Sequence, residues 1–218
     1  MITVIPAILE KDPEEIKHKL QKVDGLVEWV QIDIADNTLV PNTTVSDPIL
    51  FAPFTSKLNL EVHLMVRDPL LYADKFIKAG FKRLFAHVEG DHVVEFMDLC
   101  EEQNVEAGLA IDGPTPLDKI KPYLEDVDAV LVMAIEAGFS GRPFREDTVE
   151  KIKALKNIVF DLPIAVDGAM NLENAKKVVA AGADRICTNS YLFNAPDIKS
   201  AIESLKALEP QIREEIVA

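Results

Sequence analysis

The sequence predicts a single α/β domain over residues 1–218, folded as an eight-stranded (β/α)₈ barrel, or TIM barrel. Short apolar segments rich in Val, Ile and Leu, typical of parallel strands buried on both faces, alternate with helical segments along the chain. There are eight segments of each kind, the number at which such a sheet closes. The alternative is an open doubly wound sheet, which is disfavoured because no Gly-x-Gly-x-x-Gly follows the first strand.

Each element is predicted from its own pattern. The expected strands are residues 3–8, 28–34, 59–65, 82–87, 105–111, 127–133, 162–167 and 184–188. The expected helices are residues 12–23, 46–54, 69–79, 91–103, 115–124, 145–157, 171–181 and 196–208. Several helices begin at start signals, namely Asp12-Pro13, Asp68-Pro69, Asn171 and Pro196-Asp197. No linker or low-complexity tract indicates a second domain.

Composition narrows the possible partners. The net charge is −14, which argues against nucleic acid as a partner and means that an anionic substrate needs a local binding feature. No apolar run approaches the roughly 18 residues of a membrane helix, so no membrane partner is expected. Cys100 and Cys187 show no disulfide or metal spacing, and no secretory stretch opens the chain, so we expect a cytoplasmic protein.

Two carboxylates stand out at the carboxyl ends of the strands, where this fold places its active sites. Asp33 ends the second strand and Asp167 the seventh. These strands are far apart around the ring, so the two side chains can face each other across its mouth. Inverting a carbon next to a carbonyl needs one base on each face of the substrate, and this pair could supply both. Alternatively, either Asp caps the turn that follows it.

His63 ends the third strand. A lone strand-end His is more often a hydrogen-bonded structural group than a ligand. If it converges with Asp33 and Asp167, however, the three form a mixed nitrogen and oxygen site suited to Zn²⁺, Mn²⁺, Fe²⁺ or Co²⁺. Such an ion would stabilise the enediolate formed on proton removal.

Small residues follow the sixth, seventh and eighth strands, and they could expose backbone N–H groups to a phosphate. Arg142 could add a charged contact. The alternative is that these segments are ordinary turns. The candidate phosphate-binding residues are Gly138, Ser140, Gly141, Arg142, Gly168, Ala169, Asn189 and Ser190.

These residues lie in motifs that resemble those of the ribulose-phosphate 3-epimerases. The family pattern is Pro-Ser-Ile-Leu, His-x-Asp-x-Met-Asp-Gly, Val-Pro-Asn, Asp-x-His-Leu-Met, Asn-Pro-Gly-Phe-Gly-Gly-Gln and Val-Asp-Gly-Gly. The counterparts here are Pro6-Ala7-Ile8-Leu9, Gln31 to Asn37, Val40-Pro41-Asn42, Glu61 to Met65, Glu136 to Arg142 and Val166 to Ala169. The likeness runs in register from residue 3 to about residue 208.

The resemblance implies interconversion of ribulose 5-phosphate and xylulose 5-phosphate through a metal-stabilised enediolate, with the two Asp residues as acid and base. Its fourth ligand, a His on strand two, is Gln31 here, an amide that suits zinc-like ions less well. The divalent metal is therefore expected to bind weakly or not at all. The resemblance also implies a substrate pocket, formed by Ala7, Ala35, Met65 and Met133.

Further departures from the family pattern leave other activities open. Ala7 and Ala35 replace a Ser and a Met, Glu136 replaces an Asn, and Asn189 stands where Gly is usual. The chain could act on another small phosphorylated ketose, as an epimerase or lyase of a hexulose 6-phosphate. It could also be a phosphosugar-binding homologue with impaired catalysis. A homo-oligomer is expected, because barrels of this kind often assemble.

Overall fold

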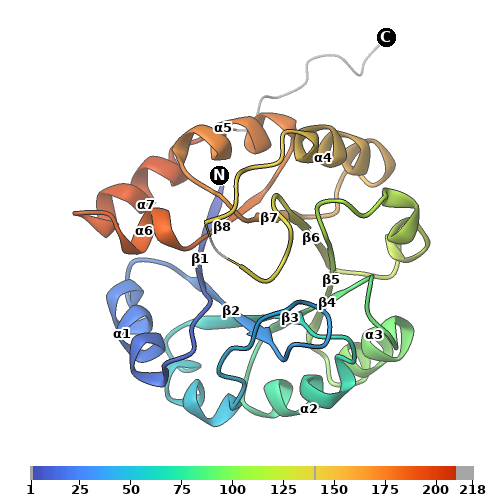
Figure 1. Ribbon diagram of the computed structural model, residues 1–218, viewed down its shortest axis with the longest axis horizontal. Helices are drawn as coiled ribbons and strands as arrows, with labels where there is room; N and C mark the ends of the chain where they lie inside the picture. The colour runs from blue at the N-terminus through green and yellow to red at the C-terminus, as the bar shows by residue number, and fades with distance from the viewer. Residues whose placement is uncertain (1, 140, 210–218) are drawn as a thin grey trace.

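A computed structural model describes residues 2–139 and 141–209, and it forms a closed parallel barrel. Figure 1 looks down the barrel and shows its strands ringed by helices. The strands are β1 (Thr3–Ile8), β2 (Trp29–Ala35), β3 (Asn59–Met65), β4 (Arg83–His87), β5 (Glu106–Ile111), β6 (Ala129–Met133), β7 (Ile164–Asp167) and β8 (Arg185–Thr188). β8 pairs with β1, which closes the ring and confirms the predicted fold.

Six of the eight predicted helices form near their predicted positions. They are α1 (Pro13–Val23), α2 (Leu70–Lys78), α3 (Val93–Glu102), α4 (Asp147–Ile158), α5 (Leu172–Ala181) and α7 (Ile198–Lys206). The start signals act as expected, since the side chains of Asp12, Asn171 and Asp197 accept hydrogen bonds from the first-turn N–H groups. A short helix that was not predicted, α6 (Ser190–Phe193), follows β8 directly.

The predicted helices 46–54 and 115–124 are wrong. The first region forms two 3₁₀ turns, η1 (Pro48–Leu50) and η2 (Ala52–Phe54), and the second forms η3 (Leu117–Lys119) and η4 (Lys121–Tyr123). Each region contains an interior proline, Pro53 or Pro122, which cannot donate the helical hydrogen bond and collides with the preceding turn. Short 3₁₀ turns tolerate these prolines.

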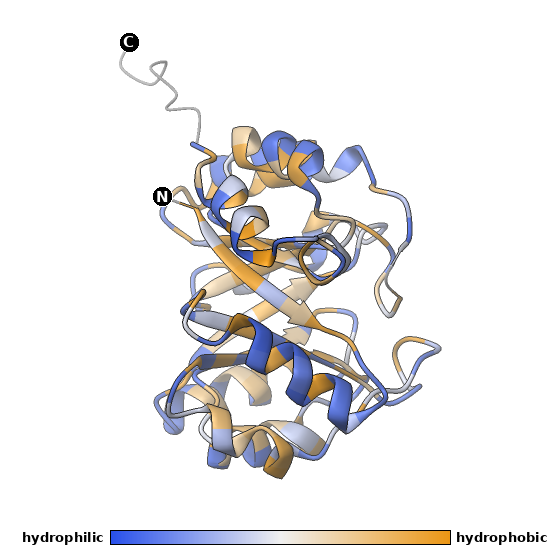
Figure 2. Ribbon diagram, turned by 90° about the vertical axis from the view of Figure 1, so that its left-hand side faces the viewer, coloured by the Kyte–Doolittle hydropathy of each residue, from blue (hydrophilic) through white to orange (hydrophobic). Residues whose placement is uncertain are grey.

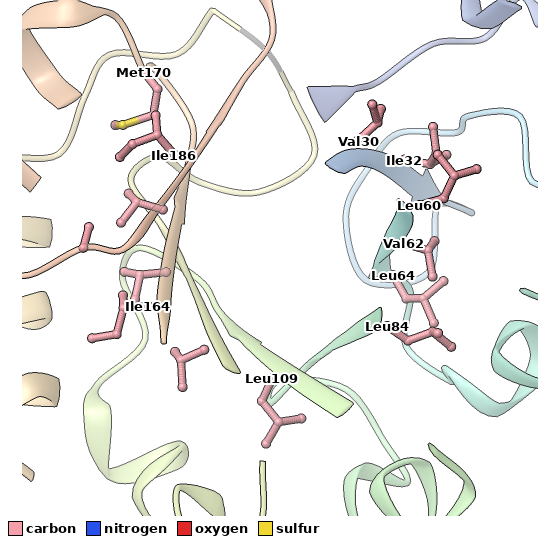
Figure 3. Close-up of a cluster of buried hydrophobic side chains, with 14 of the residues drawn as sticks. Val30, Ile32, Leu60, Val62, Leu64, Leu84, Leu109, Ile164, Met170 and Ile186 are labelled. Atoms are coloured by element: carbon pink, nitrogen blue, oxygen red, sulfur yellow. The ribbon is translucent and has the colours of Figure 1, made fainter. Parts of the chain in front are cut away.

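Two separate apolar layers hold the barrel together. Outward-facing side chains of the strands pack beneath the helices, and Figure 3 shows labelled members of this layer around the outside of the strands, including Val30, Leu64 and Ile164. In Figure 2 the strands are mostly hydrophobic, whereas the helices carry hydrophilic faces outward. No helix in the described ranges combines the length and apolar character that crossing a bilayer requires.

Inside the barrel, a second layer fills the space beneath the mouth. It includes Ile5, Phe85, Leu131 and Cys187. Gly108 on β5 makes this packing possible, because a Cβ there would lie 2.3 Å from the Phe85 ring. The interior is therefore a packed core that supports the site from below, as is usual for this fold.

Candidate active site

Four polar side chains meet at the carboxyl-terminal mouth of the barrel. Gln31 and Asp33 come from β2, His63 from β3 and Asp167 from the end of β7. Side chains two residues apart on a strand share a face, so Gln31 and Asp33 both point inward, and Asp33 pairs in register with His63. Gln31 and His63 are fully buried, and Asp33 is 6% exposed.

The two carboxylates converge as the sequence suggested. One ligand atom each from Asp33, His63 and Asp167 lies within 4.8 Å of the others. The amide nitrogen of Gln31 lies between the carboxylates and donates to both, at 2.8 Å to Asp33 Oδ1 and 2.7 Å to Asp167 Oδ2. The buried Oε1 atom of Gln31 finds no hydrogen-bond partner among the described residues. A single side chain thus ties the two acids together.

Both acids have raised pKa values because they are buried. Burial raises the pKa of Asp33 to about 7, and burial together with the charge of Asp33 raises the pKa of Asp167 to about 7. Burial lowers the pKa of His63 to about 3, so its ring is neutral near pH 7. Two acids that titrate near neutrality can be present as one carboxylic acid and one carboxylate, the states that a general acid and a general base require.

His63 is backed by a hydrogen-bonded chain that leads away from the acids. Its Nδ1 lies 3.1 Å from Asp33 Oδ1, and its Nε2 lies 2.8 Å from Nε2 of His87. The Nδ1 of His87 in turn lies 2.9 Å from Glu89 Oε2. Burial alone would raise the pKa of Glu89, but its hydrogen bond and charge interaction with His87 hold that pKa near 2.

A pocket opens above these groups, and most of the predicted site residues line it. They are Ala7, Asp33, His63, Met65, Met133, Gly138, Gly141, Asp167, Gly168, Ala169, Asn189 and Ser190. Further lining residues that were not singled out from the sequence are Leu9, Ile135, Phe139, Met170, Cys187 and Thr188. Because the predicted phosphate loops and the acids share one pocket, a single small ligand can reach both.

The remaining predicted residues lie elsewhere. Gln31 lies beneath the carboxylates, and Ala35 is buried in the barrel interior. Arg142 lies 3.5 Å from Glu136, so its charge offsets that carboxylate. It lines a hollow beside the pocket rather than the pocket itself. Ser140 lies outside the described residues.

The loop after β7 has an unusual backbone. Gly168 and Ala169 both have positive φ, of 101° and 54°. A Cβ on Gly168 would lie 2.5 Å from the Ile135 side chain, so only glycine fits there. Ala169 adopts a left-handed conformation that costs a non-glycine residue about 1 kcal/mol or more, and strain of this kind gathers at functional sites.

Lys19, His87 and Glu89 belong to the site region but were given no role from the sequence. Lys19 on α1 donates to Asn189 at 3.1 Å and to Glu10 at 2.6 Å, which places a cation at the rim of the pocket. A surface helix gives no signal that one lysine folds toward the mouth. His87 and Glu89 do carry a signal, because His87 ends β4 and Glu89 follows it by two residues, on the side of the barrel where active sites lie.

Comparison with known proteins matches residues 3–193 to the Ribulose-phosphate 3 epimerase family. This chain belongs to the ribulose-phosphate 3-epimerase family. Among its relatives, the ribulose-phosphate 3-epimerase of Bacillus subtilis is 35% identical over 94% of this chain and 99% of that protein. That of Synechocystis is 34% identical, covering 97% of each chain. The resemblance seen in the sequence is therefore confirmed.

Solved structures support the fold of this epimerase-family chain. 3-Hexulose-6-phosphate synthase from Salmonella typhimurium superposes with a TM-score of 0.74 at 13% identity, over 95% of this chain and 98% of the other. The 3-keto-L-gulonate-6-phosphate decarboxylase of Vibrio cholerae gives a TM-score of 0.73 at 12% identity, over 94% of this chain and 95% of the other. At such low identity these likenesses show the barrel alone.

Epimerases of this family use a divalent metal, and the residues here fit one. Asp33, His63 and Asp167 offer two carboxylate oxygens and an imidazole nitrogen within 4.8 Å of one another, a donor set that first-row divalent ions accept. Among the described residues, the two buried acids have no lysine or arginine within hydrogen-bonding distance, and a cation would offset their mutual repulsion. Gln31 presents its nitrogen to this group, so it could act as a ligand only after its amide turned over.

Proposed function

We propose that this chain interconverts ribulose 5-phosphate and xylulose 5-phosphate by moving the proton of carbon 3 between Asp33 and Asp167. The observation that carries the proposal is the convergence of these two carboxylates, from β2 and β7, on one pocket within 4.8 Å of each other. One carboxylate removes the proton next to the ketone, and the electron pair moves onto the ketone oxygen. The other, as the acid, returns a proton to the opposite face of the same carbon.

The environment of the two acids supports this division of labour. In the cation-free protein both pKa values lie near 7, so one shared proton can leave one acid protonated and the other ionised. The Gln31 amide nitrogen holds both carboxylates in place through hydrogen bonds of 2.7 and 2.8 Å. Fixed orientation of this kind removes entropy from the reaction step before it occurs.

Asp33, His63 and Asp167 would hold a divalent cation, and Zn²⁺, Mn²⁺, Fe²⁺ and Co²⁺ all suit this donor set. When bound, the cation supplies positive charge that stabilises the negative charge developing on the substrate's oxygens. The buried position of the group excludes bulk water, which strengthens every charge interaction within it.

The substrate's phosphate would bind the glycine-rich end of the same pocket. Gly138, Gly141, Gly168 and Ala169 lack large side chains, so a phosphate can approach their backbone, and Asn189 and Ser190 add polar groups. Lys19, held at the rim by Asn189, would attract the dianion. A chain with a net charge of −14 needs a local cation of this kind to hold an anion, and a bound phosphate would share Lys19 with Glu10.

A substrate panel tests the assignment. Purified protein, supplied in turn with Mn²⁺, Co²⁺, Fe²⁺ and Zn²⁺, is incubated with ribulose 5-phosphate and with a hexulose 6-phosphate, and products are resolved by NMR. The proposal expects xylulose 5-phosphate from the first substrate. Turnover of the hexulose 6-phosphate alone would instead show that the chain is an epimerase or lyase of that sugar. No turnover of either substrate would favour a phosphosugar-binding homologue with impaired catalysis. A homo-oligomer and a cytoplasmic location stay predictions from the sequence.

A further inference from the structure

The hydrogen bonds behind His63 restrict where its ring proton can lie. Two nitrogens that are 2.8 Å apart, such as the Nε2 atoms of His63 and His87, share one proton between them. Glu89 is an ionised carboxylate and can only accept, so the Nδ1 of His87 carries the hydrogen that faces it at 2.9 Å. With that hydrogen on Nδ1, the other ring nitrogen of His87, Nε2, is the one that faces His63 and can accept from it.

The other end of His63 faces the two acids. Its Nδ1 lies 3.1 Å from Asp33 and 3.9 Å from Asp167. A nitrogen can bind a cation only through a lone pair, and then the second ring nitrogen must carry the hydrogen and find an acceptor for it. In this buried site, where His63 is fully enclosed, His87 is the acceptor within reach of that hydrogen among the described residues.

We propose that His87 and Glu89 are positioning residues, which hold the hydrogen of His63 on Nε2 and so direct the Nδ1 lone pair at the space between Asp33 and Asp167. This inference rests on the proposed cation site, and it adds two residues that neither touch the substrate pocket nor bind the cation. They act only through His63.

The pair is itself firmly anchored. The second carboxylate oxygen of Glu89 accepts a hydrogen bond from the backbone N–H of Asp112, at 2.9 Å. Both oxygens are therefore engaged, which fixes the orientation of the carboxylate. The rings of His63 and His87 lie nearly parallel, with centroids 5.0 Å apart and an interplanar angle of 21°. His87 is 2% exposed, so water does not compete for its nitrogens. A rigid support of this kind is what sets the orientation of a ligand imidazole.

Cobalt titration of the purified protein tests the proposal, with binding followed by visible absorption and by calorimetry. Glu89→Gln replaces the carboxylate that faces His87 by a neutral amide, which is a weaker acceptor and can also donate. His87→Leu removes the acceptor for His63, whereas His87→Gln supplies an oxygen that can accept. Exposed residues on α3 and at its start provide matched controls, because Glu95→Gln and His92→Gln make the same chemical changes in a pair 3.6 Å apart at the surface. Thermal unfolding checks that every variant folds.

We expect Glu89→Gln and His87→Leu to raise the Co²⁺ dissociation constant by about 10- to 100-fold, with a smaller rise for His87→Gln. The controls should stay within about twofold, because exposed pairs contribute little. In Zn²⁺-loaded protein, two-bond ¹H–¹⁵N NMR should place the His63 hydrogen on Nε2.

Unchanged Co²⁺ affinity in folded Glu89→Gln and His87→Leu, or a hydrogen found on Nδ1 of His63, would overturn this inference while leaving the cation site intact. Absence of Co²⁺ binding by the unsubstituted protein would overturn the cation site together with the inference. The proton-transfer role of Asp33 and Asp167 is measured separately, by isotope exchange.

Discussion

The carboxylates of Asp33 and Asp167 lie within 4.8 Å of each other at the mouth of the barrel, although their strands, β2 and β7, are not neighbours in the sheet. Both accept a hydrogen bond from one amide nitrogen, that of Gln31. Closure of the barrel brings them together, because the inward-facing positions of separate strands meet above the packed core. The proton transfer proposed for this chain depends on the convergence of these two carboxylates.

Replacing Gln31 by His should strengthen zinc binding. The substitution exchanges an amide for an imidazole nitrogen beside Asp33 and Asp167, and Zn²⁺ prefers nitrogen to an amide oxygen. We expect the Zn²⁺ dissociation constant, measured by competition with a chelating dye, to fall at least about tenfold. Gln103→His on the surface is the control. Equal Zn²⁺ affinity in the Gln31→His variant and the unsubstituted protein would show that residue 31 does not face the cation.

The cation-free protein should lose stability as the pH rises from about 4 to about 7. Burial raises the pKa of Asp33 and Asp167 from 3.8 to about 7, so between about pH 4 and pH 7 the folded chain holds more protons than the unfolded chain. The free energy of unfolding contributed by these groups therefore falls with rising pH across that window. Thermal unfolding in EDTA should show a steeper fall in Tm than in the Asp33→Asn, Asp167→Asn double variant. If Tm fell equally with pH in the two proteins, the raised pKa values of Asp33 and Asp167 would be refuted.

Lys19→Met should weaken substrate binding more than turnover. Lys19 is held at the pocket rim by Asn189 and Glu10, where it can attract a phosphate dianion. We expect KM to rise about tenfold at low salt, equivalent to about 1.4 kcal/mol, with little change in kcat. Lys17→Met serves as the control, because Lys17 pairs with Glu14 on the exposed face of the same helix. A KM unchanged by Lys19→Met would remove this residue from the site.

Ala169→Gly should stabilise the protein. Ala169 has a φ of 54°, which glycine adopts freely and alanine does not. After allowing for the greater freedom of glycine in the unfolded chain, we expect a gain of about 0.5 to 1 kcal/mol in denaturant unfolding. Ala79→Gly, at a φ of −77°, should lose stability instead. A loss in both variants would mean that Ala169 is not strained.

The sequence predicted the barrel because each of the eight strands is a short run of apolar residues, and these runs alternate regularly with helical segments. It failed at 46–54 and 115–124, where apolar spacing suggested helices but interior prolines, Pro53 and Pro122, permit only 3₁₀ turns. The strand-end rule placed Asp33, His63 and Asp167 at the mouth, because every parallel strand ends on the same side.

Side-chain orientation was beyond the sequence. Gln31 was expected to offer its oxygen, yet its nitrogen faces the acids, since two carboxylates attract a donor. The inward turn of Lys19 depends on Asn189, which is distant in the chain. The His63–His87 contact likewise arises only when β3 and β4 pair, as does its extension to Glu89, two residues after β4 ends. Contacts of this kind carry no local sequence pattern.

Isotope exchange tests the central claim most directly. Ribulose 5-phosphate is incubated in D₂O with the cation-supplemented protein, and the signal of the hydrogen on carbon 3 is followed by NMR. We expect deuterium to enter carbon 3 with the unsubstituted protein and the rate to fall by about 10²- to 10⁴-fold in both Asp33→Asn and Asp167→Asn. Retention of the original hydrogen by the unsubstituted protein with every cation, or full exchange in both variants, would contradict the account.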